Sequence, residues 1–195
     1  MGLLSKDRLG KIFLIIWIPV ISAVIGFLMV NHIIAMPLPD DYKRIQENMP
    51  HLRHSPGWLI VHVIYQNCSC TNSLTSSLLE RGSQPGVDES IIFVGDDEEF
   101  ERKFKARGFY FKFETRASIA DQFRIEAAPM LLIFSPDDRL KYGGGYFERP
   151  SVYRSMDQKY LTKLKKGEDV EALPLYGCPV STRLQKITDP FGIEY

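Results

Sequence analysis

An uncharged and mostly apolar run, residues 12–30, lies close to the N-terminus and constrains the fold more than any other feature. A helix needs about 20 apolar residues to cross a bilayer. The run reaches that length when the apolar residues 33–35 are included. We therefore predict a transmembrane anchor over residues 12–36.

Two alternatives to an uncleaved anchor are a cleaved signal peptide and a buried core helix. A signal peptide has about 7–15 apolar residues followed by a small-x-small cleavage site. Here the run is longer, and the segment after it, Met36-Pro37-Leu38-Pro39, does not resemble such a site. A core helix is seldom so uniformly apolar at the start of a chain, so the pattern favours an anchor.

Charges on the two sides of the predicted anchor indicate its orientation. Basic side chains precede it, at Lys6, Arg8 and Lys11. The first charges after it are Asp40 and Asp41. The positive-inside bias then places residues 1–11 in the cytoplasm and the rest of the chain outside. In a bacterium this means a single-pass protein of the inner membrane with its domain in the periplasm, where a cysteine pair can cycle.

Composition excludes several classes of protein. Lys and Arg number 24 and Asp and Glu number 24, so the chain has no basic excess and we expect no nucleic-acid partner. Apolar residues make up 45 % and charged residues 25 %, which is typical of a globular domain. The 3 cysteines are too few for a disulfide scaffold or a four-thiolate zinc site.

The chain after the anchor divides into a linker, a domain and an extension. Residues 37–57 carry four prolines and read as a spacer with at most a helical turn or two. Apolar patterning predicts strands over 58–65, 91–94, 109–113, 130–134 and 139–147, and helices over 74–82, 96–108, 115–123 and 151–164. This order predicts a layered α/β domain with a mixed sheet over residues 58–165, followed by an extension, 166–195, with a short helix.

Two segments of this domain resemble the thioredoxin family. Residues 119–146, IADQFRIEAAPMLLIFSPDDRLKYGGGY, are similar to its second half, and 61–68, VHVIYQNC, resemble the strand that delivers its nucleophilic cysteine. The resemblance covers about residues 58–165. It implies a thioredoxin-like mixed sheet flanked by helices. It also implies a thiol–disulfide oxidoreductase that acts on protein thiols and disulfides without a cofactor.

Cys68-Ser69-Cys70 stands where the family carries its active-site cysteines, with one residue between them in place of two. A helix N-terminus favours the thiolate, so Cys68 is the candidate nucleophile and Cys70 the candidate resolving thiol. A one-residue spacer closes a tighter ring, and strained disulfides are more oxidising.

Two other functions stay open for these cysteines. Both thiolates could bind Cu(I) together with His62, which would make the chain a copper-handling assembly factor. Alternatively, the pair could be a remnant in a non-catalytic adaptor. The chain has no Met-rich or His-rich segment, so copper is not favoured, and we assign no metal site.

The resemblance also singles out Pro129 and His62. The matching family proline is cis and faces the cysteines, whereas the alternative is a trans proline that begins a strand. His62 occupies the position of a buried acid beneath the cysteine pair, where an imidazole could transfer protons. The alternative is a histidine that only packs within the strand.

Cys178 is a possible third redox cysteine. It precedes Pro179, and Val180, Leu184 and Ile187 have helical spacing, so we predict a helix that begins at Pro179 with Cys178 at its N-terminus. Three interpretations remain: exchange with the pair, a structural disulfide to one of its members, or a lone thiol.

Overall fold

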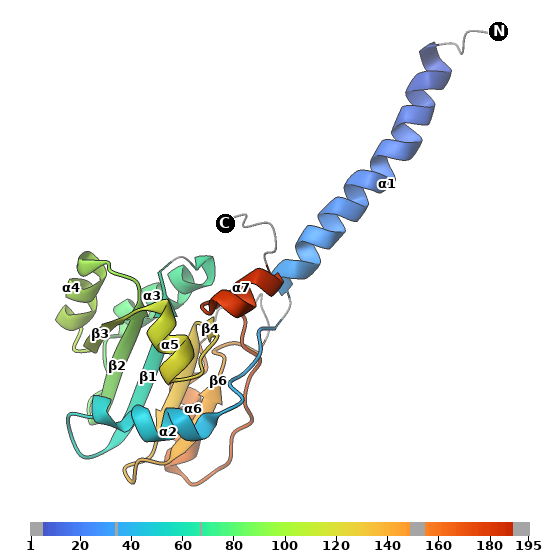
Figure 1. The fold of residues 1–195 in the computed structure, drawn as a ribbon. Helices are drawn as coiled ribbons and strands as arrows, with labels where there is room; N and C mark the ends of the chain where they lie inside the picture. The colour runs from blue at the N-terminus through green and yellow to red at the C-terminus, as the bar shows by residue number, and fades with distance from the viewer. Residues whose placement is uncertain (1–5, 34, 67, 149–154, 189–195) are drawn as a thin grey trace. The chain divides into compact units, whose positions relative to one another are not determined.

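The computed structural model describes residues 6–33, 35–66, 68–148 and 155–188 (Figure 1). It divides into two compact units, Met1–Ile34 and Ala35–Tyr195. We describe each unit by itself.

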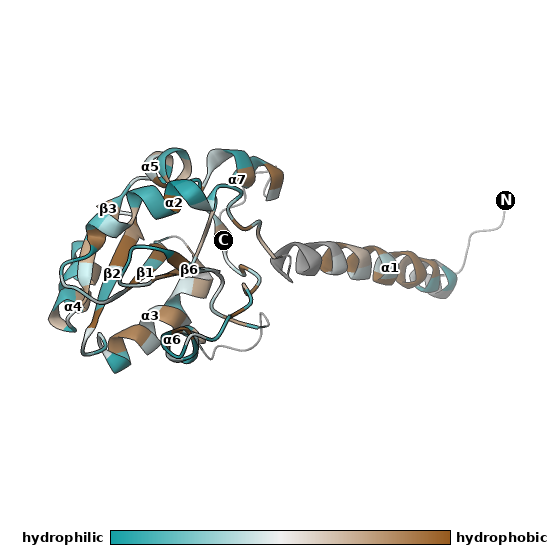
Figure 2. Cartoon of the chain, turned by 90° about the horizontal axis from the view of Figure 1, so that it is seen from below, coloured by the Kyte–Doolittle hydropathy of each residue, from teal (hydrophilic) through white to brown (hydrophobic). Residues whose placement is uncertain are grey.

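The first unit contains one helix, α1 (Lys6–Ile33). Its large apolar side chains between Ile12 and Ile25 are exposed, and Figure 2 shows this stretch as mostly hydrophobic. Within the described part of the chain, no helix combines the length and the apolarity needed to span a membrane. The side chains of residues 27–34, which belong to the predicted anchor, lie outside the described residues. Met36, the last residue of that prediction, belongs to the second unit.

The second unit is built on a five-stranded sheet in the order β3-β2-β1-β5-β6. The strands are β1 (Trp58–Tyr65), β2 (Val87–Val94), β3 (Tyr110–Glu114), β5 (Met130–Phe134) and β6 (Leu140–Gly144). β1, β2 and β3 are parallel, while β5 is antiparallel to β1 and to β6. β1 and β5 are continuously apolar because both of their faces are buried. The predicted mixed sheet is confirmed.

Helices cover both faces of this sheet, as Figures 1 and 2 show. One face carries α3 (Ser69–Arg81), α4 (Glu98–Ala106) and α6 (Asp157–Lys165), and the other carries α2 (Tyr42–Asn48), α5 (Arg116–Gln122) and α7 (Thr182–Thr188). Each layer has its own apolar core. Side-chain caps begin several of the helices; at α4 and α5, Asp97 accepts from the Phe100 N–H and Thr115 from the Ser118 N–H.

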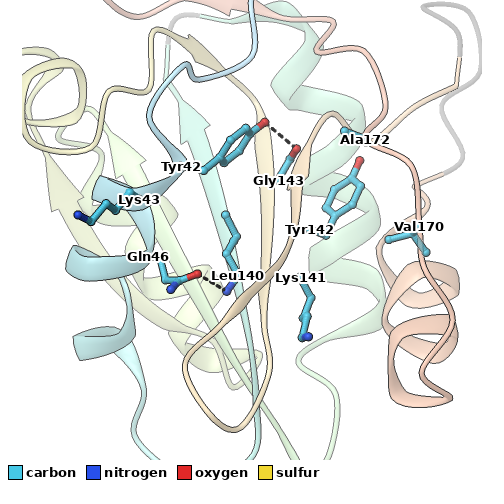
Figure 3. Close-up of a pocket in the computed structure, with 9 residues that line it drawn as sticks. All are labelled: Tyr42, Lys43, Gln46, Leu140, Lys141, Tyr142, Gly143, Val170 and Ala172. Carbon is cyan, nitrogen blue, oxygen red and sulfur yellow. Dashed lines mark hydrogen bonds between the residues drawn. The ribbon is translucent and has the colours of Figure 1, made fainter.

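The segment 37–57 differs from the expected spacer because it packs on the sheet. α2 and the short 3-10 helix η1 (Pro50–Leu52) bury the side chains of Ile45, Met49 and Leu52 in the core shared with α5 and α7. Figure 3 shows how α2 also reaches the edge strand β6. The Tyr42 hydroxyl donates to the Gly143 carbonyl at 3.0 Å, and the Gln46 Oε1 accepts from the Leu140 N–H at 3.2 Å.

β2 begins four positions before the predicted strand 91–94. The prediction was too short because residues 88–90 are polar and interrupt the apolar pattern. Asp88 is buried and accepts hydrogen bonds from the backbone N–H groups of His54 and Ser55, each at 2.6 Å. Burial raises the pKa of the Asp88 carboxyl, but the hydrogen bond from the Ser55 hydroxyl at 2.6 Å, together with these backbone bonds, outweighs burial, and the pKa lies below its usual value. The start of the predicted helix 151–164 includes positions outside the described residues, and α6 begins at Asp157.

Candidate redox site

Cys68 stands where β1 leads into α3. It is the N-cap residue of α3, with the extended backbone angles φ −129° and ψ 116°, and its carbonyl accepts from the Thr71 N–H at 3.0 Å. Cys68 therefore stands at the positive end of the α3 dipole, a position that favours the thiolate of a reduced cysteine. Cys68 is only 3 % exposed.

The disulfide partner of Cys68 is Cys178, with 5.7 Å between their Cα atoms and a sequence separation of 110. That Cα distance lies within the normal range for a disulfide. Cys70, the predicted partner, is a free and half-buried cysteine. The structure thus adds Cys178 to the site and leaves the thiol of Cys70 available.

The cis-proline loop lies against this disulfide. The Ala128–Pro129 bond is cis, as the thioredoxin resemblance implies. β4 (Ala127–Ala128) pairs antiparallel with β7 (Cys178–Pro179), so that Ala128 faces Cys178. The Cys68 Sγ lies 3.7 Å from the Ala128 carbonyl oxygen. Two cysteines and the cis-proline, far apart in sequence, therefore meet in one place.

The residues that carry Cys178 form a short segment between two buried anchors. We call residues 176–179 the C-terminal strap. All four are partly exposed, whereas Leu175 and Val180 on either side are fully buried. The Leu175 carbonyl accepts from the Met36 N–H at 2.7 Å. The strap is consequently held at both ends, independently of its disulfide.

Hydrogen bonds secure the far end of the strap. The N–H groups of Val180 and Ser181 both donate to the Glu126 carbonyl, at 2.6 and 3.1 Å. The Arg116 Nε donates to the Val180 carbonyl at 2.8 Å. The Arg183 guanidinium forms an ion pair with the Glu126 carboxylate and lowers its pKa, mainly through the hydrogen bond between them.

Gly177 allows the strap to approach the cis-proline loop. A Cβ at this position would lie 2.6 Å from the Ala128 carbonyl carbon and 2.8 Å from the Pro129 Cδ, closer than real Cβ atoms approach. A side chain at position 177 would therefore force β7 away from β4 or shift the cis-proline loop.

The prediction that Cys178 lies at a helix N-terminus is wrong. Cys178 and Pro179 form β7, and α7 begins only at Thr182. The Ser181 Oγ accepts from the Leu184 N–H at 3.0 Å and caps this helix. Pro179 fits the strand because its missing N–H leaves no ladder donor unpaired.

His62 is fully buried in β1, and both of its ring nitrogens have partners other than cysteine thiols. Nδ1 lies 2.8 Å from the Tyr146 Oη, and Nε2 lies 3.2 Å from the Glu89 Oε2. Glu89 also accepts from the Arg81 guanidinium at 2.7 and 3.1 Å, and Arg81 donates to Asp157 at 2.8 Å. Through Glu89 and Arg81, this network therefore links strands β1 and β2 to helices α3 and α6.

Burial and hydrogen bonding set the ionisation of this network. Burial would raise the pKa of Glu89, but its contacts with His62 and Arg81 outweigh burial and lower the pKa to about 2. Burial raises the pKa of Tyr146 well above its usual value. Sequence reasoning missed Glu89, although a charge within an apolar strand is itself a signal of a buried partner.

The candidate copper ligands are not assembled. Cys68 is engaged in the disulfide and His62 in its own network. Among the residues that the structure describes, no group of three or more His, Cys, Asp or Glu side chains is arranged to hold a metal ion.

Comparison with solved structures places the domain among known folds. A hypothetical protein from Sinorhizobium meliloti 1021 is 20 % identical over 76 % of this chain and 91 % of its own, with a TM-score of 0.52. An uncharacterized conserved protein from Geobacillus kaustophilus is 19 % identical over 65 % of this chain and 78 % of its own, with a TM-score of 0.51. The strand order, the cysteine at the β1–α3 junction and the cis-proline before β5 decide the family of folds. The fold is thioredoxin-like.

Other solved structures with the thioredoxin-like fold match at lower similarity. One is the thioredoxin domain of a thiol–disulfide oxidoreductase from Bacteroides vulgatus, 13 % identical over 58 % of this chain and 81 % of its own, with a TM-score of 0.39. No protein-family model matches the chain, and no curated protein matches it.

Proposed function

We propose that this chain is a membrane-anchored thiol–disulfide oxidoreductase that acts on protein partners outside the cytoplasm, with Cys68 as the reacting cysteine. The observation that carries the proposal is the position of Cys68. It caps α3 beside the cis-proline loop and is joined to Cys178.

The chemistry is a two-step exchange. In the reduced chain, the Cys68 thiolate attacks one sulfur of a partner disulfide, a mixed disulfide forms, and the partner's other sulfur leaves as a thiolate. The Cys178 thiolate then attacks the Cys68 sulfur, which forms the Cys68–Cys178 disulfide and releases the partner's second thiolate. The partner gains two electrons and the chain loses two. Net transfer in the other direction oxidises a partner dithiol, which loses two electrons while the chain gains two, and the two reduction potentials determine the direction.

The location outside the cytoplasm is supported by charge and by cysteine chemistry. Lys6, Arg8 and Lys11 precede the apolar stretch of α1, whose large side chains are exposed. A disulfide persists in an oxidising compartment and is rare in the cytoplasm. A reporter that is active only in the periplasm, fused after Tyr195, should be active in a bacterial host. Activity from only a cytoplasm-dependent reporter would overturn this orientation.

A trapping experiment tests the proposed activity. The full chain is reduced, freed of reductant and mixed with a disulfide-bonded model protein such as insulin. We expect reduction of insulin faster than by an equal concentration of glutathione, and loss of this activity in Cys68→Ser. The double variant Cys70→Ser/Cys178→Ser should accumulate a mixed disulfide on Cys68. If the wild-type chain is no faster than glutathione and the double variant traps no partner, the non-catalytic adaptor becomes the better interpretation.

A further inference from the structure

We propose that Cys70 exchanges with the Cys68–Cys178 disulfide, so that the disulfide moves to Cys68–Cys70 and the C-terminal strap separates from β4. This inference rests on the proposed function, because it assigns roles to all three cysteines at the same site. It makes the strap a removable cover for Cys68.

The first observation is the position of the free thiol. Cys70 lies in the first turn of α3, two residues after the disulfide-bonded Cys68. Positions i and i+2 at the start of a helix have Cα atoms about 5.4 Å apart. This distance lies inside the range of about 4.4–6.8 Å that a disulfide requires. Cys70 therefore has a free thiol, and its Cα lies within disulfide distance of the Cys68 Cα.

The second observation is that Cys68 is inaccessible while the strap is closed. Its exposed fraction is 3 %, its sulfur is bonded to Cys178 of the strap, and the Ala128 carbonyl oxygen lies 3.7 Å from it. A partner protein therefore cannot approach the Cys68 sulfur in this form. The Cys70 thiol does not have to reach Cys68 from outside the molecule, because the two residues lie at the start of the same helix.

The third observation is the attachment of the strap. Its two ends are fixed by the buried side chains of Leu175 and Val180, whereas its four residues pair with β4 over only two positions. Once the disulfide is transferred, these few contacts are all that hold the strap on β4. The fixed ends keep the Cys178 thiol near Cys68, so its return is intramolecular and has a high effective concentration.

The exchange is balanced without an external oxidant or reductant. The Cys70 thiol gives its proton to water or buffer, and its thiolate attacks the Cys68 sulfur. The Cys70–Cys68 bond forms, the Cys68–Cys178 bond breaks, and Cys178 leaves as a thiolate that takes up a proton. The number of disulfides stays at one, and exactly one thiol is free before and after.

The single free thiol provides the readout. The purified full chain is oxidised, incubated without reductant, quenched with acid, and labelled with N-ethylmaleimide in denaturant. Peptide mass spectrometry then shows which cysteine carries the label. We expect two populations of singly labelled chain, one labelled at Cys70 and the other at Cys178. The Cys178→Ser variant should form the Cys68–Cys70 disulfide under the same oxidation.

A displaced thiol is the matched control. In Cys70→Ser/Ser73→Cys the free thiol lies five residues after Cys68, where the Cα atoms of a helix are about 8.7 Å apart. That distance exceeds the limit of about 7 Å for a disulfide. We expect the label only at position 73 in this variant, with Cys178 unlabelled.

Label found only at Cys70 in the wild-type chain, together with failure of Cys178→Ser to form a disulfide, would overturn the exchange. The insulin assay separates this outcome from failure of the proposed function. A chain that reduces insulin but never labels at Cys178 retains its activity without the exchange. A chain that labels at Cys178 but does not react with insulin performs the exchange without that activity.

Discussion

Reduction of the Cys68–Cys178 disulfide should lower the free energy of unfolding, by an amount that depends on the sequence separation of the two cysteines. A cross-link removes chain entropy from the unfolded state, and this entropy grows with the logarithm of the loop length. For a separation of 110 residues the entropy model gives about 4.8 kcal/mol at 25 °C. In a unit of this size the loss corresponds to a fall in Tm of about 10–20 °C. The reduced chain should still be folded, since both strap anchors are buried without the disulfide.

Urea unfolding of the full chain, with and without reductant, measures this difference. Trp58 at the start of β1 gives a fluorescence signal from the sheet. Cys70→Ser/Cys178→Ser is the control, because it retains one cysteine and forms no disulfide within the chain. Its unfolding midpoint should match that of the reduced wild type and should not respond to reductant. Coincident midpoints for oxidised and reduced wild-type chain would refute the reasoning.

Three further outcomes are expected. The folded-state pKa of Glu89 is lowered to about 2, so its stabilising contacts with His62 and Arg81 are fully present above about pH 4.5 and are lost as the pH falls toward 2. Urea unfolding should show a loss of about 3 kcal/mol over that range, which Glu89→Gln abolishes. Gly177→Ala should weaken strap pairing by about 1–3 kcal/mol and raise the reduction potential of the disulfide by about 20–65 mV in glutathione titrations. An unchanged potential would exclude the steric argument. Flotation with lipid vesicles should recover the full chain but not a chain without residues 1–34, and equal recovery of both would count against the anchor.

Sequence patterns predicted the elements that are apolar throughout or begin with a side-chain cap. β1 and β5 agree with their predicted ranges because both faces of each strand are buried. The start of α4 was predictable because its capping residue, Asp97, bonds to a backbone N–H only three residues away. The cis state of Pro129 followed from the family resemblance, since local sequence does not specify it.

The features that depend on distant residues were not predictable in the same way. The pairing of Cys68 with Cys178 joins positions 110 residues apart, and three cysteines allow several pairings. Pro179 is compatible with either a helix start or a strand, and only pairing with β4 decides between them. His62 gives no sign of its contacts with Tyr146 and Glu89 because both come from other elements of the fold.

The contacts of α2 with β6 also protect the protein from aggregation through an exposed edge strand. An outer strand with free hydrogen-bonding groups can pair with a second chain and begin aggregation. On β6, the side chains of Tyr42 and Gln46 occupy two of these groups. The opposite outer strand, β3, is short and carries the ion pair of Lys112 with Glu114, and short strands with charged side chains are poor templates for a second chain. The segment before β1 therefore shields one edge of the sheet from association, and the short length and charged side chains of β3 protect the other edge.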